Sequence, residues 1–390
     1  MRSICNCRRL VFVLSGLYLL CILIATRKLY QLSITNHNNA AHVTHRSGPH
    51  LVEIWSKASI GDYLWSHILN GPLLAPNGPL LNTANLVYKD IHFSFKSGPG
   101  LVPATAPKNV THLVIVLNGR SENKIEQARV WLDSMPAFED LRTLAVILLG
   151  DEKCNNEWIL LYLKKNGGSI DFVFVTYDSL LVDGESFYQW PLGVSVYRGF
   201  PNVNPASLDL TYPREYTCNF LGTIYPNSSR ERLSKFIKGS SRLQKECFIA
   251  GREKWQPLEN EQSRQLYLDT ILQSDLTLSP VGQNTECYRI YEALSLGSIP
   301  VVEDIMTPGA CDASSEASPL RLLKKMNAPM LYLKDWSQLE EVLESETLLS
   351  KEEKISRRKS AVRWYEEFKH SIKKIFVNVL RERWFDLKAD

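Results

Sequence analysis

Apolar runs alternate with amphipathic stretches along most of the chain, and this alternation predicts its secondary structure. In the first half, apolar runs predict strands at 112–117, 143–149 and 170–176. The stretches 122–134 and 157–165 between them have the spacing of helices, and so do residues 51–69, with an interruption at Gly61. Apolar strands separated by helices indicate a parallel sheet that is covered on both faces.

The same alternation begins again after a proline-rich passage from Pro191 to Pro213. Further apolar runs predict strands at 217–221, 246–250, 276–279, 299–302 and 330–333. The intervening stretches predict helices at 230–238, 262–273, 285–295, 320–325 and 336–343, and a long amphipathic pattern from Val362 to Val379 predicts a C-terminal helix. Two such series indicate an α/β protein with two Rossmann-like, doubly wound domains that face a cleft, at residues 51–205 and 206–390.

The N-terminus has a different pattern. Residues 10–26 are 17 positions without a charge, the short end of the roughly 17–25 that span a bilayer. A cleaved signal peptide is the alternative, but its apolar core is usually about 7–15 residues long and ends at a small-x-small site, which is missing here. Arginines in the tail 1–9 favour a cytoplasmic N-terminus. We therefore expect a transmembrane helix at 10–26, a polar stem at 27–50, and a lumenal remainder.

Net charge, glycosylation sequons and cysteines each add to this description. The chain of 390 residues has a net charge of +3 and 22% charged residues, which gives no indication of nucleic-acid binding. Two N-x-S/T sequons, at Asn109 and Asn227, are predicted glycosylation sites and fit a lumenal location. Five cysteines follow the apolar segment; because five is odd, at least one is free or pairs with another chain. We expect Cys287 to be a buried thiol.

Glycine or a charged residue follows every predicted strand that closes a βα unit. In open parallel sheets, ligands bind beyond the carboxyl ends of the strands. The positions concerned are 118–120, 150–152, 177–178, 222–223, 251–252, 280–282 and 303–304. Glycine and aspartate also occur in such turns for conformational reasons alone. All seven loops should nevertheless converge on one crevice, which makes them candidates for a shared site.

The loop before the predicted helix 285–295 is the most informative. Gly282 permits a backbone turn, and the helix that follows directs free amides at the loop, which makes an anion site. Arg289 could hold a phosphate and Glu292 could accept hydrogen bonds from ribose hydroxyls. Glu286, in the first turn, suits the helix dipole whatever its role. The alternative is an exposed Glu286–Arg289 pair beside a solvated Glu292, but the apolar residues around them favour burial.

Absent motifs exclude several enzyme classes. The sequence has no G-x-G-x-x-G, no G-x-x-x-x-G-K-[ST] and no G-x-S-x-G, so a dehydrogenase, a P-loop kinase and an α/β-hydrolase are disfavoured. It also has no D-x-D, the motif with which many glycosyltransferases hold a metal-bound nucleotide. We therefore expect phosphate binding by amides and arginine, without a metal ion or a cofactor.

The segment 276–304 resembles the exostosin-type glycosyltransferases, which have the GT-B fold. Three motifs carry the resemblance: P-x-G at 280–282, R-x-x-E-A at 289–293 and G-x-I-P-V-V at 297–302. It implies that the second domain binds a UDP-sugar, with Arg289 on phosphate and Glu292 on ribose. The stretch NFLGTIYPNSSRERL, which contains Gly222 and Arg230, resembles the start of the family's second domain.

Further stretches, among them GDEKCNNEW and QWPLGVSVYR, are similar to one branch of this family. The resemblance implies a type II membrane protein of the Golgi apparatus. It would transfer xylose from UDP-xylose to ribitol-5-phosphate on the O-mannosyl glycan of α-dystroglycan, and other Golgi glycosyltransferases of the same pathway are conceivable partners. Two alternatives stay open: a different UDP-sugar donor, and a non-catalytic Golgi protein that binds glycans.

Formation of a β-xylosyl product from a UDP-α-sugar inverts the anomeric carbon, so the reaction needs a base for the acceptor hydroxyl and stabilisation of the leaving UDP. The candidates for the base are Asp178, Asp151 and Glu152, which follow strands of the first domain and could equally be turn or cap residues. Because the implied acceptor carries a phosphate, Asn118, Arg120 and Arg198 are the candidates for binding it.

Overall fold

The structure is a computed structural model that describes residue 28 and residues 48–256, 258–313 and 318–388. The chain divides into two compact units, Met1–His50 and Leu51–Asp390, and nearly all described residues belong to the second. The predicted tail, the transmembrane helix at 10–26 and nearly all of the stem lie outside the described residues. Within the described ranges, no helix combines the length and the apolar character that crossing a membrane requires.

The first sheet, called here the N-terminal sheet, has eight strands in the order β2-β3-β4-β1-β5-β6-β7-β8. The strands β1, β5, β6, β7 and β8 are neighbours in that order, and each pairs with the next in parallel. Their bounds are His50–Ser56, His112–Asn118, Thr143–Leu149, Phe172–Val175 and Phe187–Gln189 for β1, β5, β6, β7 and β8. Beyond β1 lie three strands with antiparallel pairing: β2 (Ala75–Pro76), β3 (Asn82–Tyr88) and β4 (Ile91–Ser97).

The central strands β5, β6 and β7 are apolar almost throughout because both faces of the sheet are covered there. On β5, Leu113 and Ile115 pack with helix α3 (Glu122–Ser134), while Val114 and Val116 belong to the core on the opposite face. Side chains alternate between the two faces of a strand, so a strand covered on both faces needs an unbroken apolar run. The predicted parallel α/β arrangement is confirmed, and the antiparallel strands β2 to β4 are an addition that the sequence analysis missed.

The C-terminal sheet has five parallel strands in the order β10-β9-β11-β12-β13. Their bounds are Cys247–Arg252, Tyr216–Thr223, Ser274–Ser279, Ile299–Glu303 and Leu331–Leu333. The chain order reverses between β9 and β11, and in open α/β sheets such a reversal opens a crevice at the carboxyl ends of the strands. Gly222 in β9 and Gly282 after β11 flank this reversal.

The helices around the C-terminal sheet largely agree with the predictions. They are α4 (Ser229–Lys238), α5 (Ser241–Glu246), α6 (Glu261–Leu272), α7 (Tyr288–Ser295), α8 (Arg321–Lys325), α9 (Leu339–Leu348) and α10 (Lys351–Phe385). Helix α7 begins three residues later than predicted, so Glu286 precedes the helix and is not in its first turn. Segment 157–165 forms 3₁₀ turns at Glu157–Tyr162 and Lys164–Asn166 where a helix was predicted.

The prediction of a helix over residues 51–69 is wrong for its first half, which forms β1. Helix α2 (Ile60–Tyr63) follows and continues into a π-helical turn at Leu64–Ile68. The run LVEIWS is short and apolar, and such runs cannot be assigned to strand or helix from periodicity alone. Gly61 does not interrupt the structure: a Cβ there would lie 2.1 Å from Ser56 Oγ, so glycine lets α2 pack against the end of β1.

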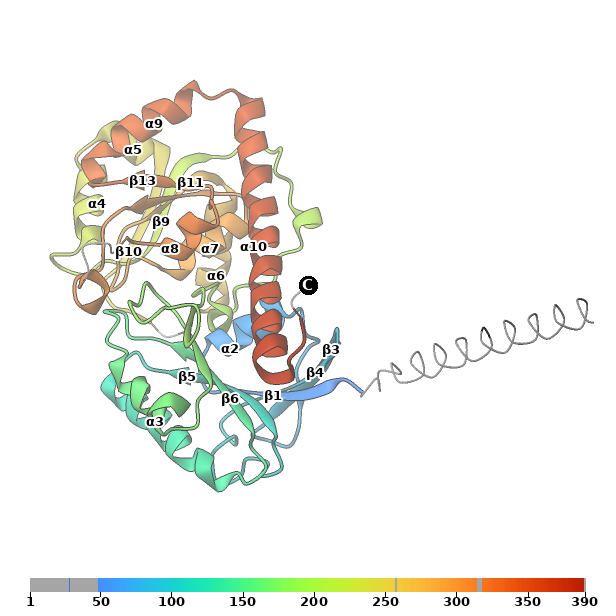
Figure 1. Cartoon of the computed structure of the whole chain (residues 1–390). Coiled ribbons are helices and arrows are strands. Elements are labelled where there is room, and N and C mark those ends of the chain that lie inside the picture. Colours follow the sequence, from blue (N-terminus) through green and yellow to red (C-terminus); the bar gives the residue numbers. More distant parts are fainter. Residues whose placement is uncertain (1–27, 29–47, 257, 314–317, 389–390) are drawn as a thin grey trace, which may run out of the picture. The chain divides into compact units, whose positions relative to one another are not determined.

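Helix α10, 35 residues long, joins the two sheets (Figure 1). It begins with a capping box between Ser350 and Glu353. Its middle packs against α7 of the second sheet, and farther along Phe376 packs on Phe93 and Phe174 of the first. Sequence analysis predicted this helix from its apolar spacing, but not that it would pack against both sheets.

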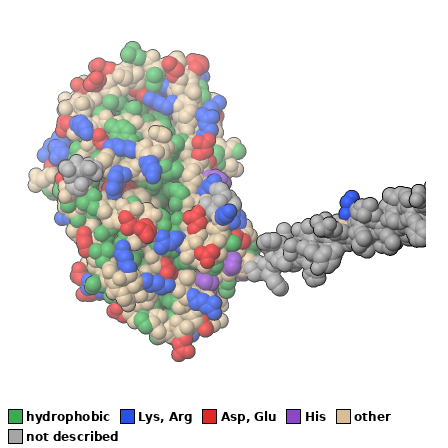
Figure 2. Space-filling view, viewed as in Figure 1, with side chains coloured by type: hydrophobic (Ala, Val, Ile, Leu, Met, Phe, Trp, Pro, Cys, Tyr) green, Lys and Arg blue, Asp and Glu red, His purple; other side chains and the backbone are tan. Residues whose placement is uncertain are grey.

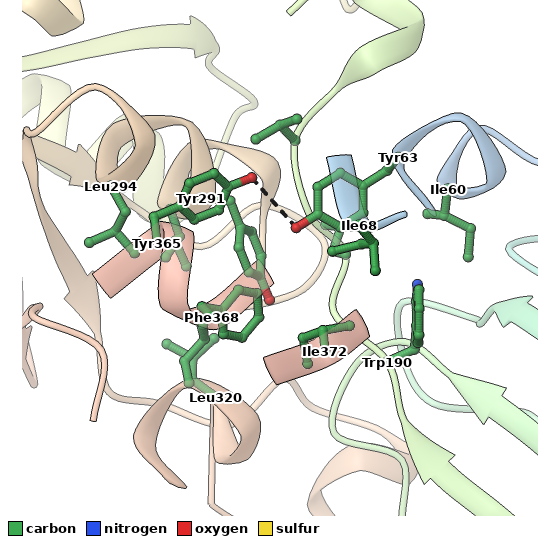
Figure 3. Close-up of a cluster of buried hydrophobic side chains, with 14 of the residues drawn as sticks. Ile60, Tyr63, Ile68, Trp190, Tyr291, Leu294, Leu320, Tyr365, Phe368 and Ile372 are labelled. Atoms are coloured by element: carbon green, nitrogen blue, oxygen red, sulfur yellow. Dashed lines mark hydrogen bonds between the residues drawn. The ribbon is translucent and has the colours of Figure 1, made fainter. Parts of the chain in front are cut away.

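Aromatic side chains fill the space between the sheets (Figure 3). Tyr63 from α2 and Tyr365 from α10 approach each other with their hydroxyl oxygens 3.5 Å apart. Tyr291 from α7 packs against Phe368, with the rings tilted by 42° and their centroids 5.8 Å apart. These side chains belong to one core that includes residues of both sheets. The boundary predicted at 205–206 falls between β8 and β9, in the connection across this shared core.

Two disulfides form among the five described cysteines. Cys218–Cys247 joins β9 to its neighbour β10, and Cys154–Cys311 joins the loop after β6 to the loop after β12. Cys287 is free, as predicted, but it is only partly buried. The second bridge therefore ties the two sheets together covalently.

Candidate functional site

A cavity of ≈ 550 Å³ lies where the carboxyl ends of strands from both sheets meet. The N-terminal sheet contributes Arg120 and Glu152, and the connection between the sheets contributes Ser195, Tyr197 and Arg198. The C-terminal sheet and its helices supply most of the remaining wall, including Gly222, Arg230, Arg252, Trp255, Glu259, Tyr267, Gly282, Glu286, Arg289 and Glu292. The structure thus brings most of the predicted site residues to one cavity.

Arg289 and Arg230 line this cavity without acidic partners. Arg289 Nη2 donates to the Leu221 carbonyl at 2.7 Å, and Arg230 Nη1 donates to the Thr223 carbonyl at 2.9 Å. The Nε atoms of both side chains are buried without a hydrogen-bond partner. The ion pairs of the described residues include no carboxylate within 4.0 Å of either guanidinium. Buried donors and charges without partners are costly, so an anion at this position would stabilise both.

Two glycines allow these arginines to lie close to the strand ends. A Cβ at position 222 would be 2.8 Å from Arg289 Nη2, and a Cβ at position 282 would be 2.5 Å from Arg230 Nη2. Gly282 has no positive φ, so its function differs from the turn expected from sequence. Glycine is required here for a close approach of side chain to backbone.

Electrostatics in this part of the cavity favour a negatively charged ligand. Burial, together with the neighbouring charge of Arg289, lowers the pKa of Arg230 to about 10. Arg289 also lies over the ring of Phe220, with its guanidinium carbon 4.8 Å from the ring centroid. Because Arg289 is in the first turn of α7, the free amides of that helix end face the same region.

Glu286 and Glu292 are buried, so the alternative of an exposed charged pair is wrong. Glu286 Oε1 accepts hydrogen bonds from Leu192 N at 2.9 Å and from Tyr291 Oη at 2.5 Å. Burial raises the pKa of Glu286 to about 7, and the nearby charge of Asp178 raises it too. The carboxylate therefore fixes the segment that connects the two sheets to the start of α7.

Glu292, six residues further along the chain and inside α7, makes a similar contact. Its Oε1 accepts from Ser195 N at 3.0 Å and from Ser195 Oγ, and its Oε2 accepts from Tyr267 Oη at 2.6 Å. Three protein donors already engage this carboxylate at the cavity wall. A contact with ribose stays a prediction, and the observed contacts assign Glu292 a role in positioning the wall.

Among the three candidates for the base, Glu152 alone lines the cavity. Its Oε1 lies 3.3 Å from Arg120 Nη2. Asp151 instead stabilises its own turn, where Oδ1 accepts from Lys153 N at 2.9 Å and Asn155 N at 3.3 Å.

Asp178 is turned away from the cavity and binds the N-terminus of α8. Its two carboxylate oxygens accept from Leu320 N at 2.7 Å and Arg321 N at 2.9 Å. Burial raises the pKa of Asp178, and the hydrogen bonds from the α8 amides oppose the rise. This residue therefore links the two sheets at a helix cap, which is a structural role that competes with proton transfer.

The residues predicted to bind the acceptor also divide into some that line the cavity and one that stabilises a turn. Arg120 and Arg198 line the cavity, whereas Asn118 accepts a hydrogen bond from Arg120 N at 3.1 Å and shapes the turn beneath it. Arg120 donates to the hydroxyl of Tyr177. Arg198 lies 3.4 Å from Glu259 and contacts the ring of Trp255, with its guanidinium carbon 5.4 Å from the centroid.

Sequence analysis did not select Trp255 and Glu259. Both lie in the irregular loop between β10 and α6, where no periodic pattern marks them. Both predicted glycosylation sites, Asn109 and Asn227, have exposed side chains. Among the described residues, no cluster of three His, Cys, Asp or Glu side chains could hold a metal ion. On the face drawn in Figure 2, acidic and basic side chains are interspersed, in keeping with the small net charge.

Two sheets that share a cavity lined by arginines, at the carboxyl ends of their parallel strands, define an α/β protein with a site suited to phosphorylated ligands. Two family models match the chain: RXYLT1 N-terminal domain at residues 52–191 and RXYLT1 C-terminal domain at residues 197–385. The chain belongs to the ribitol-5-phosphate xylosyltransferase 1 family, which confirms the resemblance seen in its sequence.

Curated relatives carry that name in several vertebrates. The protein of Danio rerio is 47% identical over 340 residues, which are 86% of this chain and 78% of the relative. The protein of Homo sapiens is 46% identical over 338 residues, 84% and 75% of the two chains. Among solved structures, the catalytic domain of starch synthase IV from Arabidopsis thaliana, bound to ADP and acarbose, matches with a TM-score of 0.41 and 8% identity over 85% of this chain and 99% of that one.

Proposed function

We propose that this chain is an inverting glycosyltransferase that transfers xylose from UDP-xylose to ribitol-5-phosphate, forming a β-linked product. Its relatives are named ribitol-5-phosphate xylosyltransferase 1, which supports the sugar and the acceptor. The observation that carries the donor assignment is the pair Arg230 and Arg289, whose guanidinium groups line the cavity without carboxylate partners. A diphosphate supplies the missing negative charge.

The leaving diphosphate would bind between these two arginines and the first amides of α7. Negative charge develops on the leaving UDP as the glycosidic bond to phosphate breaks, and fixed positive groups at that point lower the barrier. Glycines at 222 and 282 keep the guanidinium groups at the strand ends. Glu286 and Glu292 hold the opposite wall through Leu192 and Ser195. We retain both carboxylates in the donor site as positioning residues.

Glu152 is our candidate for the base. It enters the cavity from the N-terminal sheet, opposite the arginines of the C-terminal sheet, which is where an in-line attack on the anomeric carbon requires a proton acceptor. The acceptor hydroxyl gives its proton to a Glu152 oxygen as its own oxygen bonds to xylose. Arg120, 3.3 Å from Glu152, orients this carboxylate and is available to the acceptor phosphate, together with Arg198.

A location in the Golgi membrane, with the catalytic part in the lumen, agrees with the apolar segment 10–26 and the two sequons. The natural acceptor would then be the ribitol phosphate on the O-mannosyl glycan of α-dystroglycan. No metal is needed in this scheme, because arginines and amides neutralise the diphosphate. The alternatives predict another UDP-sugar as donor, or a glycan-binding protein without turnover.

A donor panel tests the proposed function. The purified protein is incubated with a ribitol-5-phosphate acceptor and UDP-xylose, UDP-glucuronate or UDP-N-acetylglucosamine, and products are measured by mass spectrometry. We expect a pentose added from UDP-xylose alone, with full activity in EDTA. A preference for another donor would establish the first alternative, and binding of UDP without any product would establish the second. Loss of activity in EDTA that manganese restores would contradict metal-free binding.

A further inference from the structure

Trp255 stands out in the cavity wall because it is 54% exposed. The other aromatic side chains that line the cavity are each more buried: Tyr197, Phe200, Tyr225, Tyr267 and Tyr288. A second exposed apolar side chain of the same wall, Leu266 on α6, has 47% of its surface accessible. The indole contacts the guanidinium of Arg198, yet more than half of its surface stays open, and a flat apolar face of this kind suits a planar ligand.

The loop that carries Trp255 is held in place by a set of charged contacts. Glu259 accepts from Arg252 Nη2 at 2.7 Å and Nη1 at 3.1 Å, and from Ser263 Oγ at 2.8 Å. Arg198, from the connection between the sheets, lies 3.4 Å from the same carboxylate and donates to the Gln256 carbonyl at 3.0 Å. The indole is thus exposed on a tethered loop, which reduces the entropy that a ligand contact would cost.

The position of Trp255 along the carboxyl edge of the C-terminal sheet indicates which part of a ligand its indole would contact. The carboxyl ends follow one another in the order β10, β9, β11, β12. Gly222 in β9 and Gly282 after β11 mark the proposed diphosphate position, and Trp255 follows β10 on one side of it. On the other side, the Glu152 carbonyl accepts from Asn284 Nδ2 at 2.7 Å beside the loop after β12. Trp255 and Glu152 therefore lie on opposite sides of the diphosphate position.

A nucleoside diphosphate sugar has the same linear order, with the base at one end, the diphosphate in the middle and the sugar at the other end. We infer that the nucleobase of the donor stacks on the indole of Trp255, so that the donor lies along the carboxyl edge of the C-terminal sheet with its sugar toward Glu152. The inference rests on the proposed function. It assigns the binding of the nucleobase to Trp255, in the loop between β10 and α6.

Contacts next to Trp255 support a continuous donor site. Arg252 Nε lies 3.4 Å from Thr223 Oγ1, and the carbonyl of the same Thr223 accepts from Arg230. One residue at the end of β9 thus connects the arginine of the diphosphate position with the arginine that anchors the Trp255 loop. A ligand that bridges the two positions contacts groups which the protein already holds in register.

Two ligands distinguish the contribution of the nucleobase to affinity from that of the diphosphate. UDP contains both groups, whereas inorganic pyrophosphate lacks the base. Binding of each ligand is measured by calorimetry on the full chain and on its variants Trp255→Ala and Trp255→Phe. Stacking of a base on an aromatic side chain typically contributes enough that its removal weakens binding roughly 5- to 150-fold. We expect Trp255→Ala to weaken UDP binding by that factor and to leave pyrophosphate binding unchanged, and Trp255→Phe to restore most of the UDP affinity.

Four other results would contradict the inference, and each of them has a different cause. Unchanged UDP affinity in Trp255→Ala, with UDP binding intact in the wild type, rejects the nucleobase contact and leaves the proposed function standing. If the same variant instead raises the KM for the ribitol-5-phosphate acceptor alone, Trp255 faces the acceptor and the inference is equally wrong. Absence of UDP binding to the wild type rejects the proposed function itself, and the inference with it. Equal losses for UDP and pyrophosphate would indicate a collapsed loop and reject stacking.

Discussion

Cys154 and Cys311 form a disulfide that joins the N-terminal sheet to the C-terminal sheet beside the cavity, across 157 residues of sequence. The residue two places before Cys154 is Glu152, our candidate base, and its carbonyl also accepts a hydrogen bond from Asn284. The loop that carries the candidate base is therefore fixed to the sheet that we propose binds the donor. Asp178, Glu286 and Glu292 add three more connections across the two halves, so the site is largely preorganised before substrates bind.

Replacement of this disulfide by Cys154→Ser with Cys311→Ser should lower both stability and turnover. Loss of a bridge that closes a long loop costs about 2–5 kcal/mol, and release of the Glu152 loop should reduce kcat more than the affinity for UDP. Thermal unfolding and steady-state kinetics measure the two effects. The matched control is Cys218→Ser with Cys247→Ser, which removes a bridge within one sheet and should affect stability with little change in kcat. Equal kcat losses in both double variants would contradict the role of the inter-sheet bridge.

Arg230 and Arg289 should dominate the affinity for UDP. Hydrogen bonds to charged groups contribute about 1.5–3 kcal/mol each, so Arg230→Ala and Arg289→Ala should each weaken UDP binding by roughly 10- to 150-fold in calorimetry. Arg242→Ala, on the exposed side of α5, provides the control and should bind UDP normally. Normal UDP affinity in both cavity variants would show that the diphosphate binds elsewhere.

Gly282→Ala should weaken UDP binding without unfolding the protein. The added Cβ would lie 2.5 Å from Arg230 Nη2. Because the end of a flexible side chain can move away, we expect the guanidinium to be displaced while the backbone keeps its conformation. Gly222→Ala should displace Arg289 in the same manner. Circular dichroism checks the fold and calorimetry the affinity. Wild-type affinity in both variants would mean that the close approach of arginine and glycine has no function in binding.

Glu152→Gln should strongly reduce turnover and spare the binding of UDP. A positioned general base contributes typically 10²- to 10⁴-fold to the rate, and we expect kcat to fall within that range. Asp151→Asn is a matched control, because it changes the same charge at the adjacent position while Oδ1 can still accept from Lys153 N and Asn155 N. Near-normal kcat in Glu152→Gln would transfer the role of base to another residue.

Much of the fold follows from sequence because strands buried on both faces are unbroken apolar runs. The runs at 143–149 and 299–302 were located to within one residue for this reason. β1 was mistaken for a helix because its run is short and ambiguous. The strands β2 to β4 were missed although β4 alternates buried and half-buried residues. Such alternation is the pattern of a strand with one covered face.

The candidate site was predictable only in part. Arg289 and Gly282 were found because a glycine before a helix carries a local signal. The partners of Glu286 and Glu292 could not be found in this way, since Leu192 and Ser195 lie 94 and 97 residues away in sequence. The environment of Asp178 was hidden from sequence for the same reason: its partners are the amides of α8, 142 and 143 residues away. Contacts between distant segments depend on how the two sheets pack, which periodicity does not encode.

The buried carboxyl group of Glu286 should make stability depend on pH. Burial raises its pKa from the usual 4.5 to about 7 in the folded protein, so between these values the folded state holds a proton that the unfolded state has lost. Stability contributed by this group is therefore greatest at low pH and decreases as the pH rises through that interval. The decrease amounts to about 3 kcal/mol at most.

Glu286→Gln tests this dependence, because glutamine keeps an oxygen that can accept from Leu192 N and Tyr291 Oη and never ionises. We expect the variant to gain stability relative to the wild type between pH 5 and pH 8, measured as the free energy of unfolding in urea at both values. Asp209→Asn, at an exposed aspartate, should show no such gain over the same interval. Parallel pH profiles for the wild type and Glu286→Gln would show that Glu286 is already ionised in the folded protein at pH 5, and that its two hydrogen bonds outweigh its burial.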